Sequence, residues 1–469
     1  MRSGWTKTAP SRALGALLLL LPAAALHATP PRTVGFRESA RVAIGHAPVG
    51  LALGDLTGDG APDVVVVNDD STLTWLFADG GGGLGALRDM LLGADLLGLA
   101  LGDVDHDGLL DAVVSSPTAG TVFTLIGDRR GNFNGPISLR GPWSPGALAL
   151  LLDRSLPDLV VADLFFQGLV VAGNAGGGSF AFSRQLAGFI DPVSIAVGDM
   201  NRDAYPDVAV ADAASHTATV VIDLESSALA ARFDQPLEGR PLAVALGDLD
   251  RDGRDDLVAA TENPGALAVC RAGPDGSFGP ARAFPAGPAP VALVLGDFVA
   301  DGRLDAALAD SANRSIGIWV GRGDGTFLKL GDVPTDLGPV GLAMADMNGD
   351  GWPDLVCANH DDATVQVFLN TSVLAAGSLR LFAPTPNPAY TTARLTFALS
   401  ASTSVRLELY DLTGRLVRRL VDGVVMSAGP HDVIWDGRTD AGDRARSGLY
   451  LARLRAGGAE AATRLALQR

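Results

Sequence analysis

The sequence predicts an all-β protein, built as a seven-bladed β-propeller that a strand from the N-terminus closes, followed by a small β-sandwich. Three observations support this fold class. An acidic loop recurs seven times with a period near 50 residues, and short apolar or β-branched strands flank each copy. No stretch of the chain keeps the 3.6-residue spacing of a helix. At 469 residues, the chain is long enough for more than one domain with its own core.

The first element is a secretory signal peptide, which we predict over residues 1–28. Three basic residues precede the apolar run from Ala13 to Leu21, and small residues follow as far as Ala28. A membrane anchor is the alternative, but the apolar run is too short to span a bilayer. We therefore expect a secreted or bacterial cell-surface protein without a transmembrane segment.

Charge is distributed unevenly along the chain. The formal net charge is −17, although the signal peptide contributes three positive charges. Residues 373–469 contain thirteen Arg and eight Asp or Glu, which gives +5, so residues 29–372 carry about −25. Because this larger segment is strongly acidic, nucleic acid is an unsuitable partner for it.

The two cysteines, Cys270 and Cys357, fall in different repeats and at different strand positions. We predict two buried free thiols rather than a disulfide bond. Stability must then come from packing and from bound metal.

The repeats define the blades of the propeller, over residues 29–372. Each acidic loop lies between an apolar strand and a β-branched strand, and a third strand, a Gly-rich turn and a fourth strand follow, as in one blade. A strand that begins at Phe36 precedes the first loop, whereas no fourth strand follows the last third strand. We therefore expect the N-terminal strand to complete the last blade. The final Asp of each loop is Asp63, Asp111, Asp158, Asp207, Asp256, Asp305 or Asp354.

The acidic loops are candidate calcium sites. Oxygen side chains at positions 1, 3, 5 and 9 of a tight turn can converge on one hard cation, and Gly at position 6 allows the chain to reverse. Metal-free Asx turns are the alternative, but carboxylates about 4 Å apart repel by roughly 4 kcal/mol at an effective dielectric near 20. Four loops have complete sets: Asp103, Asp105, Asp107 and Asp111; Asp199, Asn201, Asp203 and Asp207, with Ala204 at the turn; Asp248, Asp250, Asp252 and Asp256; and Asp346, Asn348, Asp350 and Asp354.

The other three loops are weaker candidates. The third loop, Asp153 to Asp158, is too short for the pattern, so we expect no ion there. The first loop has Thr at position 3, and the sixth has Val299 there. We expect four to six Ca²⁺ ions in all, and they are structural because protein ligands fill each site. The ligands of the weaker loops would be Asp55, Thr57, Asp59 and Asp63 in the first, and Asp297, Asp301 and Asp305 in the sixth.

The motif apolar-Gly-Asp-x-(Asp/Asn/Thr)-x-Asp-Gly-x-x-Asp-(Leu/Val) resembles the FG-GAP and VCBS repeats of integrin α-chain-type β-propellers. The resemblance covers roughly residues 33–372. It implies a propeller with calcium in the loop between the first two strands of a blade.

Variable loops join the second and third strands, at the opposite ends of the strands from the acidic loops. A scaffold that keeps its strands and varies its loops usually binds a ligand there. We expect an extracellular protein or glycan as the partner, although Phe165 and Phe166 could instead pack on a neighbouring blade. The candidate residues on this face are Asp70, Phe165, Phe166, His216, Glu262, Arg314 and His360.

No catalytic motif is evident, and we predict a binding module rather than an enzyme. A polysaccharide-degrading enzyme is an alternative, and it would need acid and base groups that converge on the variable face. A purely structural surface component is a third class. The scattered acid or base candidates are Asp163, His216, Glu262 and His360.

Residues 373–383 are predicted as a linker, and residues 384–469 as a β-sandwich of short strands. Pro386 to Pro388, Tyr410 to Arg415, His431 to Gly437 and Ser447 to Tyr450 resemble the FlgD-like immunoglobulin fold and the C-terminal sorting domains of the type IX secretion system. That resemblance implies passage across a bacterial outer membrane and attachment at the surface. The alternative is an accessory sandwich domain.

Overall fold

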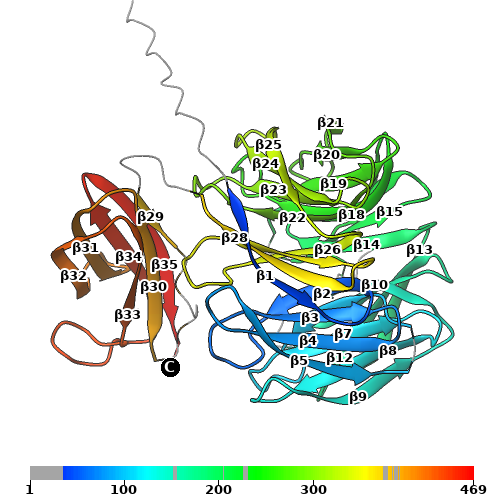
Figure 1. The fold of residues 1–469 in the computed structure, drawn as a ribbon, viewed down its shortest axis with the longest axis horizontal. Helices are drawn as coiled ribbons and strands as arrows, with labels where there is room; N and C mark the ends of the chain where they lie inside the picture. Colours follow the sequence, from blue (N-terminus) through cyan, green and yellow to red (C-terminus); the bar gives the residue numbers. More distant parts are fainter. Residues whose placement is uncertain are drawn as a thin grey trace, which may run out of the picture.

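A computed structural model describes residues 35–468 except 94, 152–155, 204, 225–230, 373–378, 383, 385–388 and 390. Four features of the sequence analysis lie outside the described residues: the predicted signal peptide, the first half of the third loop, Ala204 and the Pro-Asn-Pro segment. Every regular element that the structure describes is a β-strand, which confirms the predicted all-β class. Figure 1 shows two bodies, a large ring of sheets and a smaller C-terminal sandwich.

Seven four-stranded antiparallel sheets are described between residues 36 and 370, and we number them as blades 1 to 7 in chain order. Blade 1 contains β2 (Pro48–Gly54), β3 (Asp63–Asn68), β4 (Thr72–Ala78) and β5 (Leu84–Leu91). Blade 2 contains β6 (Leu99–Gly102), β7 (Asp111–Ser116), β8 (Thr121–Gly127) and β9 (Phe133–Arg140). Blade 3 contains β10 (Pro145–Leu151), β11 (Asp158–Asp163), β12 (Gly168–Gly176) and β13 (Ser179–Ala187).

The later blades repeat this order. Blade 4 contains β14 (Pro192–Gly198), β15 (Asp207–Asp212), β16 (Thr217–Val221) and β17 (Arg232–Pro236). Blade 5 contains β18 (Arg240–Gly247), β19 (Asp256–Glu262), β20 (Ala266–Cys270) and β21 (Arg282–Pro285). Blade 6 contains β22 (Pro290–Gly296), β23 (Asp305–Asp310), β24 (Ser315–Gly321) and β25 (Phe327–Pro334). Blade 7 contains β26 (Pro339–Ala345), β27 (Asp354–Asn359), β28 (Thr364–Asn370) and β1 (Phe36–Ala43).

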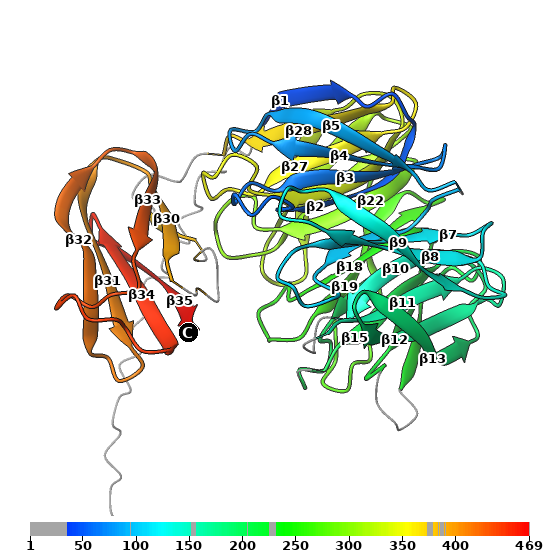
Figure 2. The same cartoon turned by 90° about the horizontal axis from the view of Figure 1, so that it is seen from below.

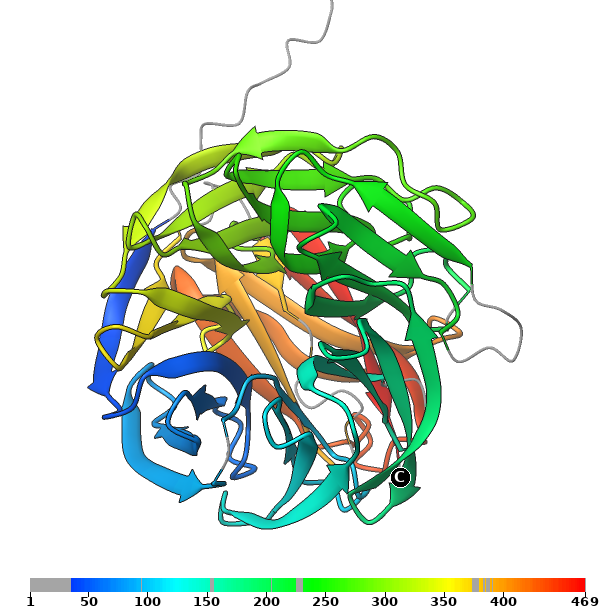
Figure 3. The same ribbon diagram turned by 90° about the vertical axis from the view of Figure 1, so that its right-hand side faces the viewer.

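The N-terminal strand closes the ring, as the sequence predicts. β1 pairs antiparallel with β28, and Phe36 lies opposite Asn370. The first strands of the blades contact one another in chain order, and β26 contacts β2. Figure 3 shows this ring from the side away from the C-terminal sandwich. β1 thus supplies the outer strand of blade 7, and the two ends of the propeller are joined within one sheet.

The second strand of each blade lies in the core. All six residues of β3 are buried, as are all six of β27. Neighbouring blades cover both faces of these strands, so the strands carry continuous β-branched or aliphatic runs rather than an alternating pattern. The two cysteines fall in this core, and both are buried and unpaired, as predicted.

The C-terminal domain is a two-sheet sandwich (Figure 2). Its core surrounds the fully buried Trp435. β29 pairs with β30, so part of the segment predicted as a linker is a strand of this sandwich. One sheet contains β29 (Leu379–Leu381), β30 (Ala393–Leu399) and β33 (Gly429–Trp435), and the other contains β31 (Thr403–Asp411), β32 (Leu416–Met426), β34 (Gly448–Ala456) and β35 (Ala459–Leu467).

Candidate metal loops and binding face

In the six acidic loops other than the third, the first aspartate organises the backbone of the loop. In the second loop, Asp103 Oδ1 accepts a hydrogen bond from the Asp107 N–H at 3.1 Å, and Oδ2 accepts one from the Gly108 N–H at 2.9 Å. The backbone of Gly108 has φ +85°, a region in which residues with a Cβ are strained. The fold of the loop therefore depends on the carboxylate at position 1 and the Gly at position 6.

The ninth aspartate has a role that the sequence analysis missed. Asp111 is fully buried, and its Oδ2 accepts the Val104 N–H at 2.9 Å, while Oδ1 accepts the Gly127 N–H at 2.8 Å. It thus connects the loop to the end of the third strand, sixteen residues further along the chain. The other six loops make the equivalent bond to the third strand: Asp63 to Ala78, Asp158 to Asn174, Asp207 to Asp223, Asp256 to Ala272, Asp305 to Gly321 and Asp354 to Asn370.

Blade 3 indicates that this connection does not depend on metal. Its short loop lacks the acidic pattern, yet Asp158 still accepts the Asn174 N–H at 2.7 Å. The signal in the sequence was the regular spacing between each ninth Asp and the end of the third strand. That spacing has meaning only once the pairing of the strands is known.

Two of the loops bring three carboxylates together in the part of the chain that the structure describes. The carboxylate oxygens of Asp103, Asp105 and Asp111 lie within 4.8 Å of one another, as do those of Asp248, Asp250 and Asp252. An all-oxygen donor set of this kind fits Ca²⁺. In the fourth and seventh loops, the amide at position 3 donates to the carboxylate at position 5, from Asn201 to Asp203 and from Asn348 to Asp350.

Arginines contact several of these carboxylates. In the fifth loop, the Arg271 guanidinium contacts Asp250, and Arg254 contacts Asp252. In the sixth loop, which lacks a ligand at position 3, Arg380 from β29 lies 3.4 Å from Asp297 Oδ2. The sixth loop therefore has a cationic side chain from the C-terminal domain beside its first carboxylate.

Burial raises the pKa of the ninth aspartates, against the opposing effect of their two backbone hydrogen bonds. The pKa of Asp111 rises to about 6, and that of Asp354 rises to about 7. The neighbouring loop carboxylates add to this increase. The pKa values of Asp63, Asp207 and Asp256 also rise to about 6, and that of Asp305 rises to about 7.

These shifts predict how the stability of the calcium-free protein depends on pH. The folded-state pKa values of 6 to 7 exceed the ordinary value of 3.8, so between these limits the folded state binds more protons than the unfolded state. We expect the melting temperature of metal-free protein to fall as the pH rises from 5 to 8. Thermal melts in metal-free buffers between pH 5 and 8 measure this fall in melting temperature. A melting temperature that increases steadily with pH would contradict the prediction.

The loops between second and third strands begin with a buried polar residue in each blade. These residues lie five positions after the ninth Asp: Asn68, Ser116, Asp163, Asp212, Thr261, Asp310 and Asn359, each at most 3% exposed. Because the acidic loop and the variable loop lie at opposite ends of the second strand, they lie on opposite faces of the ring. Five of these side chains form hydrogen bonds within the turn that follows them, whereas Ser116 and Asp212 bond to the segment that precedes the first strand of their blade.

Most of the predicted ligand-face residues take part in local structure. The backbones of His216 and Arg314 have φ +56° and +53°, so both occupy left-handed turn positions. Asp70 contacts His46, and Glu262 forms an ion pair with Arg240 at 2.8 Å. His360 Nε2 lies 3.6 Å from Asp69 Oδ2 in blade 1, and His360 Nδ1 lies 2.8 Å from Asp361 Oδ1.

The four acid or base candidates do not form one cluster. Asp163, His216, Glu262 and His360 belong to blades 3, 4, 5 and 7 respectively. Phe165 and Phe166 are exposed, at 69% and 46%, so they do not pack into a neighbouring blade. They are the large apolar side chains that this face presents from blade 3.

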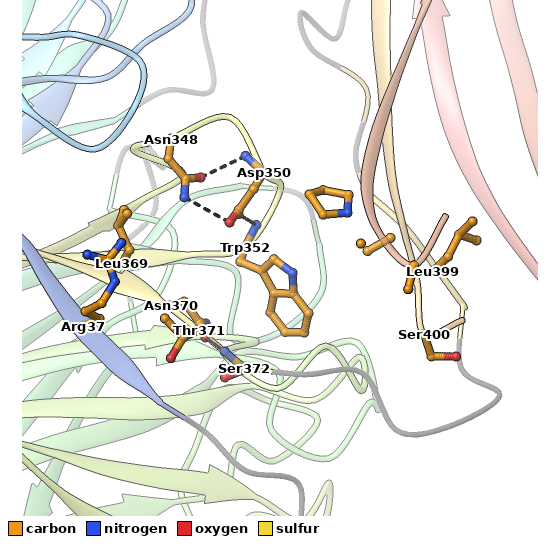
Figure 4. A pocket seen from close by; sticks show the side chains of 14 residues that line it. Arg37, Asn348, Asp350, Trp352, Leu369, Asn370, Thr371, Ser372, Leu399 and Ser400 are labelled. Atoms are coloured by element: carbon orange, nitrogen blue, oxygen red, sulfur yellow. Dashed lines mark hydrogen bonds between the residues drawn. The ribbon is translucent and has the colours of Figure 1, made fainter. Parts of the chain in front are cut away.

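The C-terminal domain lies against the face that carries the acidic loops. Trp352 of the seventh loop and Phe382 have ring centroids 6.5 Å apart. A pocket of about 370 Å³ lies beside this contact, between the seventh loop and the first sheet of the sandwich (Figure 4). Asn348, Asp350 and Trp352 line its propeller side, and Leu399 and Ser400 line the opposite side.

The described part of the chain contains no helix with the length and hydropathy needed to span a bilayer.

Solved structures with a similar fold are β-propellers of low sequence identity. BBS1N in complex with ARL6DN has a TM-score of 0.52 at 13% identity, covering 71% of this chain and 96% of that chain. A catalytically inactive virginiamycin B lyase from Staphylococcus aureus, with quinupristin, has a TM-score of 0.51 at 12% identity. The match covers 72% of this chain and 99% of the lyase chain. Streptogramin B lyase has a TM-score of 0.51 at 13% identity, and the match covers 72% of this chain and 98% of the lyase chain. At these identities the likeness concerns the fold alone.

Sequence comparison with protein families gives two matches. The FG-GAP-like repeat matches residues 55–114, 248–308 and 297–357, and each match begins at the first Asp of an acidic loop. The FlgD Ig-like domain matches residues 389–460. No curated protein matches the sequence. The chain therefore contains FG-GAP-like repeats within its β-propeller and a FlgD Ig-like domain at its C-terminus.

Proposed function

We propose that this protein is a secreted or cell-surface recognition module, whose propeller binds structural calcium on one face and an extracellular protein or carbohydrate on the other. One observation carries the proposal. The face next to the C-terminal domain repeats the same carboxylate loop, whereas the opposite face has loops that differ between blades and expose aromatic side chains. A constant face suits a structural role, and a variable face suits recognition.

Calcium in the complete loops is supported by the donor sets. The four ligands in the second loop would be Asp103, Asp105, Asp107 and Asp111, and those in the fifth loop would be Asp248, Asp250, Asp252 and Asp256; three of each set already have carboxylate oxygens within 4.8 Å of one another. The bound ion would neutralise the repulsion among these carboxylates and fix the turn between the first two strands. The fourth and seventh loops would use Asn201 and Asn348 at position 3 in the same role.

Calcium is expected to stabilise the protein measurably. At about 1 mM Ca²⁺, and with dissociation constants of order 10⁻⁴ to 10⁻³ M, each occupied site adds about 0.4 to 1.4 kcal/mol. Thermal melts with Ca²⁺, with Mg²⁺ and with excess chelator measure this effect, and Mg²⁺ is the control for general ionic screening. A melting temperature that is the same in all three conditions would contradict the calcium part of the proposal.

The recognition function is tested by binding. The intact protein, with its calcium, is screened against immobilised glycans and extracellular proteins, and each positive ligand is retested after chelation. Binding without any change in the ligand supports a recognition module, whereas release of a cleaved product supports a polysaccharide-degrading enzyme. An absence of binding to every ligand supports a purely structural surface component.

The FlgD Ig-like domain would serve export or attachment at the cell surface. Fusion of residues 373–469 to a reporter protein, expressed in a bacterium with a type IX secretion system, tests this role. Surface display of the reporter would support it, and retention of the reporter inside the cell would argue for an accessory sandwich domain.

A further inference from the structure

A pocket of about 400 Å³ lies at the outer edge of blade 3, on the face opposite the acidic loops. Its lining combines aromatic and polar side chains. Trp143 comes from the segment before β10, Phe166 from the turn after β11, and Phe182 from the outer strand β13. The polar groups of the lining are Asp163, Ser183, Arg184 and Gln185.

One of the two carboxylate oxygens of Asp163 accepts no hydrogen bond from the described residues. Asp163 is fully buried, and its Oδ1 accepts hydrogen bonds from the backbone N–H groups of Ser144, Phe165 and Phe166 at 3.0 to 3.2 Å. Among the described residues, no group donates to Oδ2, which is also buried. A buried carboxylate oxygen without a donor is costly, so a donor from a ligand would stabilise it.

Comparison with blade 6 shows which donor blade 3 lacks at this position. Asp310 occupies the same position, and its Oδ2 accepts a hydrogen bond from Asn313 Nδ2 at 2.8 Å. The turns have the same length, so Phe166 stands where blade 6 has Asn313. In blade 4, both oxygens of Asp212 accept backbone N–H groups at 2.8 Å. Blade 3 therefore has a partly exposed aromatic ring, Phe166, at the position where blade 6 has a side-chain donor.

The aromatic side chains are arranged around this carboxylate. Trp143 and Phe182 form an edge-to-face pair with centroids 4.9 Å apart, and Phe165 and Phe166 form another at 4.9 Å. The Trp143 indole is held by its hydrogen bond to Gly120 O at 2.9 Å. Phe182 is 49% exposed, close to the value for Phe166. Exposed aromatic rings around a pocket indicate a binding site rather than ordinary surface.

The charges of the pocket define the class of ligand. The lining contains one acidic and one basic side chain, Asp163 and Arg184, and Arg184 Nη1 also donates to Leu224 O at 3.0 Å, so neither sign of ligand charge is favoured and a neutral ligand suits the pocket. The ligand must also donate a hydrogen bond to Oδ2 and place an apolar surface on the rings. A sugar ring meets both conditions, because its hydroxyl groups donate and its C–H face packs on aromatic side chains.

We propose that this pocket of blade 3 is a binding site for a neutral sugar, with Asp163 as hydrogen-bond acceptor and Phe166 and Phe182 as the packing surface. This inference rests on the proposed recognition function and names both its ligand class and its place.

Fluorescence titration of the intact, calcium-loaded protein tests the site. The ligands are neutral hexoses, N-acetylhexosamines and their oligosaccharides, with choline as a cationic control and sialic acid as an anionic control. Because Trp143 lines the pocket, its emission should change on binding, and Trp143→Phe should remove that change. Phe166→Asn should weaken sugar binding by about tenfold or more. The new amide can donate a hydrogen bond to Asp163 Oδ2, as Asn313 Nδ2 donates to Asp310 Oδ2 in blade 6, and the oxygen is then unavailable to the sugar.

The controls separate loss of binding from loss of folding. Phe182→Ser removes a second ring and should also weaken binding, whereas Leu91→Asn changes a 71% exposed apolar residue in blade 1 and should leave binding unchanged. Wild-type affinity in Phe166→Asn, preference for choline or sialic acid, or absence of sugar binding would overturn the inference. Calcium stabilisation and binding of a protein ligand would persist in those cases if the proposed function is correct.

Discussion

Replacement of Asp111 by Ala is expected to lower the free energy of unfolding by about 3 to 5 kcal/mol, with or without calcium, because two buried N–H groups lose their acceptor. Those groups belong to Val104 and Gly127, and they join the loop to the third strand of blade 2. The carboxylate is fully buried, so its removal leaves these donors shielded from bulk solvent. Chemical denaturation, once with calcium and once with excess chelator, measures the free energy of unfolding under each condition.

Asp107→Ala is the matched control in the same loop. Asp107 is exposed, and its Oδ1 accepts the Leu109 N–H at 2.9 Å within the loop. We expect this variant to lose calcium stabilisation while its stability in chelator stays within about 1 kcal/mol of wild type. If Asp111→Ala behaved like Asp107→Ala and had no effect in chelator, the ninth aspartate would be a metal ligand without an independent structural role.

Replacement of Arg380 by Ala is expected to weaken the contact between the propeller and the C-terminal domain by about 2 to 3 kcal/mol. The guanidinium lies 3.4 Å from Asp297 Oδ2 and 4.5 Å from the centroid of the Phe382 ring. It also lies 5.5 Å from the centroid of the Trp352 ring, which belongs to the seventh loop. One side chain therefore contacts the sixth loop, the seventh loop and the sandwich.

The loss of Arg380 should be visible as independent motion of the two domains. Small-angle scattering should give a larger maximum dimension for Arg380→Ala, and proteolysis between the domains should become faster. Arg406→Ala is the control, because it removes the same charge from an exposed ion pair with Asp422 inside the sandwich. Equal behaviour of the two variants would show that Arg380 does not hold the domains together.

Much of the fold could be predicted because its information is local. The period of the acidic loops, the apolar runs beside them and the lone strand at Phe36 were enough to expect a closed ring. The chemistry of the loops was also local, since positions 1, 3, 5 and 9 lie within nine residues. Exposure of Phe165 and Phe166 was left open by the sequence, because it depends on what the neighbouring blade places beside them.

The candidate sites depend on contacts that no local pattern contains. His360 of blade 7 meets Asp69 of blade 1 only because the ring closes, and Arg380 meets Asp297 only because the sandwich lies against the acidic loops. That no described group donates to Asp163 Oδ2 can be known only from the positions of its neighbours.

The sequence by itself thus determined the repeats, the strands, the closing strand and the identity of the possible metal ligands. These follow from residue spacing and backbone preference over a few residues. Only the tertiary structure decided which carboxylate oxygens are already bound, which aromatic rings face solvent and which arginine lies beside the sixth loop. The physical reason is that hydrogen bonds and ion pairs are short-ranged, so they depend on atoms that strand pairing and blade packing bring together from distant parts of the chain.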